Sequence, residues 1–130
     1  MNRKEIEAKL LQLVRYGVDG GKKERKYFIE PAYTFVMDAL DRSSQVIRSK
    51  NPSHGKSLSG QELAAGVCDF AKELFGPYAW IVFKDWGFLT TRDIGEAVYG
   101  LIDVGIFFDD PKDKIEDFDN LFDIPTRLRL

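Results

Sequence analysis

The apolar positions of this chain recur at helical spacing in five stretches, which glycines, prolines and polar turns separate. Residues that return every three or four positions share one face of a helix and can be buried together. Ile6, Leu10 and Leu13 show this spacing in the first stretch, and Gly17 follows them as a stop. The pattern predicts helices over residues 3–17, 31–49, 60–75, 77–86 and 91–104.

The helix starts carry local signals of their own. Pro31 suits a first helical turn, where the N–H that proline lacks would have no partner. Ser59 and Glu62 have the spacing of a capping box, in which each side chain satisfies a free backbone N–H of the first turn. Thr90 and Asp93 repeat that spacing before the fifth helix. The predicted stops are Gly17, the pair Gly76 and Pro77, Gly87 and Gly105.

The pattern changes after Gly105. The next three residues, IFF, favour a short β-strand, and the DDPKDK that follows has the composition of a turn. Residues 115–124 mix apolar and acidic positions at a spacing that fits neither a strand nor a helix. They can be interpreted as the return strand of a hairpin followed by a packed tail. Whether the acidic segment Asp109–Asp123 is ordered stays open at this point.

These elements predict a mainly α domain of about five helices with a small β-hairpin near the C-terminus. From Trp86 to Asp119 the order is turn, capped helix, glycine stop, strand, turn and strand. That order is the outline of a winged helix. A winged-helix-like arrangement of the C-terminal half is therefore the specific expectation.

Composition is typical of one globular domain over residues 1–130, with 44% hydrophobic and 31% charged residues. The net charge of −2 gives no overall attraction to nucleic acid or to an anionic membrane. Cys68 is the single cysteine, which excludes an internal disulfide. The N-terminus lacks the apolar run of a signal peptide, and no stretch is apolar for the length of a membrane span. We therefore expect a cytoplasmic protein.

Charge argues against DNA binding by the predicted winged helix. A recognition helix and a wing both need positive charge, because phosphate contacts supply most of the non-specific affinity. The helix that starts near Arg92 offers one arginine against Asp93, Glu96 and Asp103. Residues 106–124 hold seven acids and two lysines, a local charge of −5. The acids are Asp109, Asp110, Asp113, Glu116, Asp117, Asp119 and Asp123, and the lysines are Lys112 and Lys114.

The run Lys22–Lys26 is the one positive cluster of the sequence, and Tyr27 and Phe28 follow it. Basic residues beside aromatic ones can bind single-stranded nucleic acid. A solvated loop that faces the acidic C-terminal segment explains the same residues. We prefer the solvated loop because the run is short and lies in a glycine loop, and nucleic-acid binding through Lys22–Lys26 is kept as an alternative.

The sequence assigns no catalytic, cofactor-binding or metal-binding residue. His54, the only histidine, lies in a polar connector near Ser53 and Ser57, and no predicted element holds them as a catalytic pair. Cys68 lies among apolar residues and is expected in the core rather than as a reactive thiol. Any two carboxylates brought together by the fold could still form an enzyme site.

Calcium binding of the EF-hand type fails at residues 117–128. Leu121 stands where a third ligand is needed, Phe122 replaces the glycine, and Leu128 replaces the final Glu. The glycines of the first loop also lack the spacing of a phosphate-binding loop. We therefore expect neither a cofactor nor a metal.

Three glycines and two tryptophans leave alternatives open. Gly66, Gly95 and Gly100 lie inside predicted helices, where each costs roughly 1 kcal/mol relative to Ala. Close helix packing is the preferred explanation, and a groove for a ligand or peptide is the other. Trp80 and Trp86 face different sides of one short helix, so one is expected in the core and the other exposed as an anchor for a partner. Which of the two is exposed stays open.

Several motifs from Gly60 onward resemble an uncharacterised bacterial family of similar length. They are SGQEL, FGP, WG and the IG helix that ends in a glycine. The segment EPAYTFVMDAL also resembles the proline-led second helix of that family, and EDFDNLFDI resembles its acidic-aromatic tail. The resemblance implies one intact bacterial domain. It implies no activity, cofactor or site residue.

The function we expect is that of a non-enzymatic protein-interaction or regulatory domain, with an unidentified protein partner or a second copy of itself. Such a domain should expose an apolar patch of several hundred Å². One alternative is a small-ligand-binding protein or an enzyme with a carboxylate-based site, which should show a deep pocket with converging polar groups. The other alternative is nucleic-acid binding through Lys22–Lys26.

Overall fold

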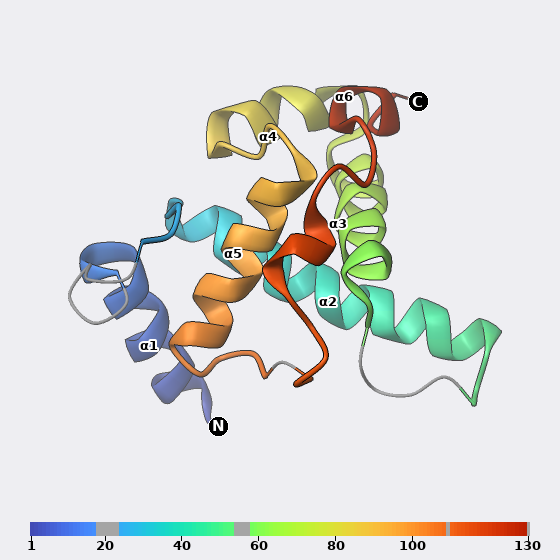
Figure 1. The fold of residues 1–130 in the computed structure, drawn as a ribbon. Helices are drawn as coiled ribbons and strands as arrows, with labels where there is room; N and C mark the ends of the chain where they lie inside the picture. The colour runs from blue at the N-terminus through green and yellow to red at the C-terminus, as the bar shows by residue number, and fades with distance from the viewer. Residues whose placement is uncertain (18–23, 54–57, 109, 130) are drawn as a thin grey trace.

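Helices are the only regular secondary structure in residues 1–17, 24–53, 58–108 and 110–129, which the computed structural model describes (Figure 1). Within these residues no helix is both long enough and apolar enough to cross a bilayer. The prediction of a mainly helical chain is confirmed. The longer helices are α1 (Arg3–Tyr16), α2 (Glu30–Lys50), α3 (Gly60–Phe75), α4 (Ala79–Trp86) and α5 (Thr91–Asp103). The shorter elements are the 3₁₀ helices η2 (Gly76–Tyr78) and η3 (Ile115–Phe118) and the helix α6 (Ile124–Arg127).

Helix α2 is the element around which the others are arranged. It is 21 residues long and packs against α1, α3 and α5. In Figure 1, α2 runs behind α5 and α3, while α4 and α6 lie together at the upper end, where α3 finishes. The predicted capping boxes are present at the starts of α3 and α5. Local caps therefore set where these helices begin, and contact with α2 sets how they lie.

The core beside α2 is rich in aromatic side chains. Phe35 stacks on Phe70 and Phe75, with ring centroids 5.2 and 5.5 Å apart. Tyr33 is fully buried, and its hydroxyl oxygen accepts a hydrogen bond of 3.1 Å from the N–H of Phe28. Burial raises the pKa of Tyr33 to about 12, because the charged phenolate would lose its hydration. The segment before α2 is thereby tied to the core.

The C-terminal half is not a winged helix, and the expected β-hairpin is wrong. No strand occurs among the described residues, and Ile106 and Phe107 form a bend. Gly105 adopts a φ of 83°, which turns the chain back on α5. The N–H groups of Ile106 and Phe107 then both donate to the carbonyl oxygen of Leu101, at 2.9 and 3.1 Å. The end of α5 thus uses the backbone donors that a strand would need, and the β preference of these residues is overridden.

The described part of the acidic tail packs between α5 and α3 (Figure 1). Thr91 is buried, and its hydroxyl donates to the carbonyl oxygen of Phe118 at 2.6 Å. The same hydroxyl oxygen accepts a hydrogen bond of 3.2 Å from the N–H of Leu121. One side chain of α5 therefore holds both sides of the bend after η3. Within Asp109–Asp123, Asp109 lies outside the described residues.

Gly66 marks the crossing of α2 and α3. A Cβ atom at Gly66 would overlap the hydroxyl of Ser43 and lie 2.8 Å from its Cβ. Ser43 is buried on the inner face of α2. The preferred explanation, close helix packing, holds at this glycine.

Gly95 and Gly100, both on α5, have different surroundings. A Cβ atom at Gly95 would lie 2.7 Å from both Cβ and Cγ of Phe118, so the ring of η3 occupies the space of the missing side chain. A Cβ atom at Gly100 would meet Tyr33 and Leu13 at 3.5 and 3.7 Å, which are ordinary van der Waals distances. Gly95 is required by packing, whereas Gly100 is not.

Gly95→Ala and Gly100→Ala form a matched pair for testing this difference. We expect Gly95→Ala to lower the free energy of unfolding by about 1–3 kcal/mol, because the added methyl overlaps Phe118. Gly100→Ala should leave it unchanged or raise it by up to about 1 kcal/mol, since alanine is the better helix former. Urea unfolding followed by circular dichroism measures both. Equal effects of the two substitutions would contradict the assigned role of Gly95.

Candidate functional site

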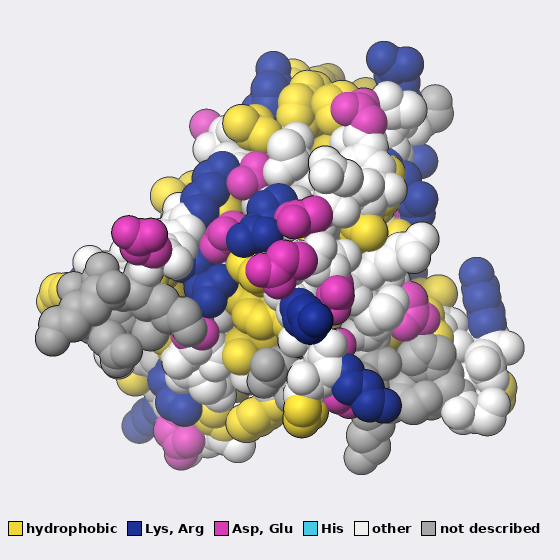
Figure 2. Space-filling model, viewed as in Figure 1, with side chains coloured by type: hydrophobic (Ala, Val, Ile, Leu, Met, Phe, Trp, Pro, Cys, Tyr) yellow, Lys and Arg dark blue, Asp and Glu magenta, His cyan; other side chains and the backbone are white. Residues whose placement is uncertain are grey.

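A cleft lies where the first turn of α3, the C-terminal turns of α5 and the segment after α5 meet. Its volume is about 500 Å³, within the range of protein clefts that bind ligands. Figure 2 shows hydrophobic side chains reaching the surface between the lower half of α5 and the tail in front of it. The aliphatic lining consists of Leu40, Leu58, Leu63, Val98, Ile102 and Ile106. The aromatic lining consists of Tyr99, Phe107, Phe108 and Phe118.

Phe108 is the most exposed large hydrophobic residue described, at 87% of its full accessibility. It lines the outer end of the cleft, whereas Phe107 beside it is half-buried. The turn at Gly105 and the hydrogen bonds back to Leu101 set the course of the chain through these residues. The apolar surface of the cleft therefore continues onto a ring that the fold itself leaves in water.

The polar side chains at the rim are engaged in holding the backbone. The Ser59 hydroxyl oxygen accepts a hydrogen bond of 3.0 Å from the N–H of Glu62, as the N-cap of α3. Asp113 accepts from the N–H of Asp110 at 3.2 Å. Asp117 accepts from the N–H of Lys114 at 3.0 Å. These three side chains thereby shape the rim of the cleft.

Metal chemistry finds no support in the described residues. They contain no group of three or more His, Cys, Asp or Glu side chains that could hold an ion. The acids of the failed EF-hand segment each have their own partner, as Asp119 lies 3.0 Å from Arg92 and Asp123 caps α6. Hydrogen bonds from the hydroxyl and N–H of Thr126 lower the pKa of Asp123, which keeps this cap ionised.

Nucleophilic catalysis is not assembled in the described residues either. His54 and Ser57 lie outside them, and the Ser53 hydroxyl donates to Asn51 at 2.7 Å. Cys68 is fully buried on α3, as expected for a core residue. Burial raises the pKa of the Cys68 thiol to about 12, so the reactive thiolate is disfavoured.

A buried ion pair joins the segment before α2 to α5. The Arg25 Nε lies 2.6 Å from a carboxylate oxygen of Asp103, with the two side chains 9% and 8% exposed. A second guanidinium nitrogen of Arg25 lies 3.5 Å from Glu96. The guanidinium carbon also lies 5.6 Å from the centroid of the Tyr99 ring. Arg25 is therefore a structural residue that fixes the chain to one side of α5.

Lys26 continues this attachment. Its Nζ donates to the carbonyl oxygen of Gly87 at 2.7 Å and to Asp93 at 3.0 Å. Lys22 and Lys23 lie outside the described residues. The described cations of the run Lys22–Lys26 thus face the acids of α5. The solvated-loop interpretation placed them opposite the C-terminal segment instead. Figure 2 shows basic and acidic side chains side by side over α5.

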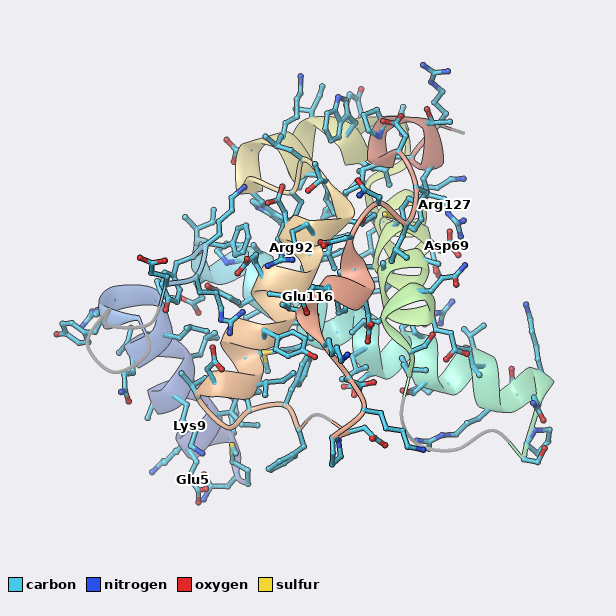
Figure 3. All side chains as sticks on the ribbon, in the orientation of Figure 1. Glu5, Lys9, Asp69, Arg92, Glu116 and Arg127 are labelled. Atoms are coloured by element: carbon cyan, nitrogen blue, oxygen red, sulfur yellow. The ribbon has the colours of Figure 1, made fainter. Side chains whose placement is uncertain are left out.

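Arg92 extends the charge network to the tail. It pairs with Glu96 at 3.4 Å and with Asp119 at 3.0 Å. The hydrogen bond that Arg92 donates to Asp119 is the main cause that raises the pKa of Arg92. Figure 3 shows Arg92 on the side of α5 that faces the tail. The charges Asp103, Arg25, Glu96, Arg92 and Asp119 alternate in sign and join three segments of the chain.

Neither tryptophan is an exposed anchor. Trp86 is half-buried and packs against Phe35 and Phe75, with centroids 5.2 and 5.8 Å apart. Trp80 is also half-buried, and the Lys84 Nζ lies 5.8 Å from its centroid. The exposed apolar side chains near this end belong to other residues. They are Leu74, Tyr78 and Ile81, and none of them lines the cleft.

Sequence reasoning missed the cleft and Phe108. The IFF run was a usable signal, because three apolar residues follow a glycine stop and precede a polar turn. Because the run was interpreted as a strand, the exposure of the Phe108 ring was not predicted. The contribution of Leu40 had no local signal, since α2 and the cleft meet only in the folded chain.

Comparisons with protein-family models, with curated proteins and with solved structures returned no match. The resemblance to an uncharacterised bacterial family stays a prediction, and the cleft has to be interpreted from its own residues.

Removing the Arg25 charge should destabilise the fold strongly. We expect Arg25→Met to lower the free energy of unfolding by about 3 kcal/mol, because it leaves Asp103 buried opposite an apolar group. The control is Arg42→Met, which removes a half-exposed pair with Glu73 and should cost less than about 1 kcal/mol. Chemical unfolding of both variants measures the difference. If both variants lose a similar amount of unfolding free energy, the Arg25 pair is screened by solvent like a surface pair.

Cys68 should be unreactive in the folded protein. At about pH 8 a thiol with a pKa of about 12 is almost entirely protonated, and the native core also blocks access. A coloured thiol reagent should therefore label one group per chain in denaturant and none in the native state over the same time. Equal rates in both states would contradict the burial of Cys68.

Proposed function

We propose that the protein is a non-enzymatic protein-interaction domain whose cleft binds apolar side chains of a partner protein. The observation that carries the proposal is the continuity of the cleft with Phe108. A volume of about 500 Å³ with mainly apolar walls opens onto a ring that is 87% exposed. Burying such a ring against a partner stabilises a complex by about 1.5–3 kcal/mol.

The geometry favours a protein segment over a small molecule. Sites for small molecules enclose most of the ligand and place a few polar groups to orient it. Here the rim groups Ser59, Asp113 and Asp117 hold the backbone. Phe108 also lies at the outer end of the cleft, where it reaches a larger partner more easily than an enclosed ligand.

The two alternatives draw less support from the site. An enzyme with a carboxylate pair would need two acids aimed at one space, and Asp113 and Asp117 instead accept hydrogen bonds from separate turns. Nucleic-acid binding through Lys22–Lys26 would need free cations, and Arg25 and Lys26 are paired with acids of α5. Apolar recognition in the cleft remains as the function with the most support.

A peptide selection tests the proposal. Random peptides displayed on phage would be selected on the immobilised wild-type protein, and the affinities of the best binders measured in solution. Phe108→Ser should weaken the peptides about 10- to 100-fold, because the exposed ring contributes its burial only in the complex. Its exposure also means that the variant should keep the stability of the wild type.

The matched control is Ile81→Ser, at an exposed apolar residue of α4 that does not line the cleft, and it should leave these affinities unchanged. Peptides that lose affinity with Ile81→Ser and not with Phe108→Ser would place binding outside the cleft and overturn the proposal. A selection that yields no binders would also count against it.

A further inference from the structure

The rim of the cleft is acidic. Residues 110–119 carry five acids and two lysines, a local charge of −3. Asp113, Lys114 and Asp117 line the cleft directly, with a combined charge of −1. A hydrogen bond from a backbone N–H leaves the negative charge of each carboxylate in place. The five acids are Asp110, Asp113, Glu116, Asp117 and Asp119.

The fold neutralises this segment at one end only. Asp119 pairs with Arg92, whose guanidinium also pairs with Glu96. Glu116 lies on the exposed side of η3 and has no ion pair with any described residue. Figure 3 shows it on the stretch of tail that passes in front of α5. The part of the segment beside the cleft therefore keeps a negative field in water.

We propose that the segment bound in the cleft is an amphipathic helix whose apolar face is flanked by lysine and arginine. This inference rests on the proposed function and adds the chemistry of the partner. The apolar walls call for apolar side chains, and the acidic rim calls for positive charge beside them. Complementary charge steers the encounter and disfavours acidic partners.

The helical form follows from what the surface offers. Strand addition needs an exposed sheet edge, and the described residues contain no strand. The cleft is instead lined by residues of the helices α2, α3 and α5, and most of its lining residues are apolar. A groove of this kind takes side chains that a helix presents every three or four residues.

The experiment compares two synthetic peptides with one apolar face. Both are helices of about 18 residues, or about 27 Å, with leucine and phenylalanine at helical spacing. One carries lysine and arginine at the flanking positions, and the other carries glutamate there. Binding to the full chain is measured by fluorescence anisotropy at low and at molar salt. We expect the basic peptide to bind about tenfold more tightly at low salt.

The preference should fade at molar salt, where the Debye length falls to about 3 Å. At low salt, Glu116→Lys should reduce the preference for the basic peptide by about two- to fivefold, and Lys112→Glu should increase that preference by a similar factor. Both residues are exposed on the same segment. The control Asp85→Lys makes the same change in net charge on α4, away from the cleft, and should have no effect.

The outcomes separate this inference from the proposed function. Equal binding of the two peptides, or tighter binding of the acidic one, would overturn the charge preference. If both peptides then lose affinity with Phe108→Ser, the proposed function still stands. If neither peptide binds, and the affinities of the selected peptides do not change with Phe108→Ser, both the inference and the proposed function are overturned.

Discussion

The packing of Phe118 against the bare backbone of Gly95 is the contact on which the rest of the structure depends. It lets η3 lie directly on α5, and the Thr91 hydroxyl then ties both sides of the following bend to the same helix. With the tail held there, residues 113–118 become a wall of the cleft, and the rim acids are fixed opposite α3. A side chain larger than hydrogen at position 95 would move this wall outward, so the geometry of the cleft depends on a residue that does not line it.

The charges of the chain fall into two groups with different roles. Acids of α5 pair with Arg25 and Lys26 of the segment before α2, and Arg92 of α5 pairs with Asp119 of the tail. In the described part of Lys22–Lys26, both Arg25 and Lys26 are thereby paired with acids of α5. The acids beside the cleft remain facing water. Although the net charge is only −2, the charges are unevenly distributed over the molecule. The proposed chemistry of the partner depends on this uneven distribution.

Local signals in the sequence predicted much of the fold. The capping boxes at Ser59 and Thr90 and the stops at Gly17 and Gly87 place helices that the structure confirms. The hairpin failed because β preference is a weak local tendency, and the end of α5 took the N–H groups of Ile106 and Phe107 for its own carbonyl. The cleft could not be foreseen, since Leu40, Leu63 and Ile102 come from three separate helices.

An exposed aromatic ring lowers the solubility of the free protein and does not stabilise its fold. Phe108 is almost fully exposed, so its replacement should leave stability unchanged, whereas Phe118 ten residues later is buried in the structure. Along one short stretch of chain, Phe118 therefore belongs to the core, whereas Phe108 is the ring on which the proposed function rests. Between them lie the acids of the rim, which stand beside the cleft where the proposed partner would bind. An apolar anchor beside an unneutralised acidic rim is the arrangement expected when binding strength comes from burial and partner choice comes from charge.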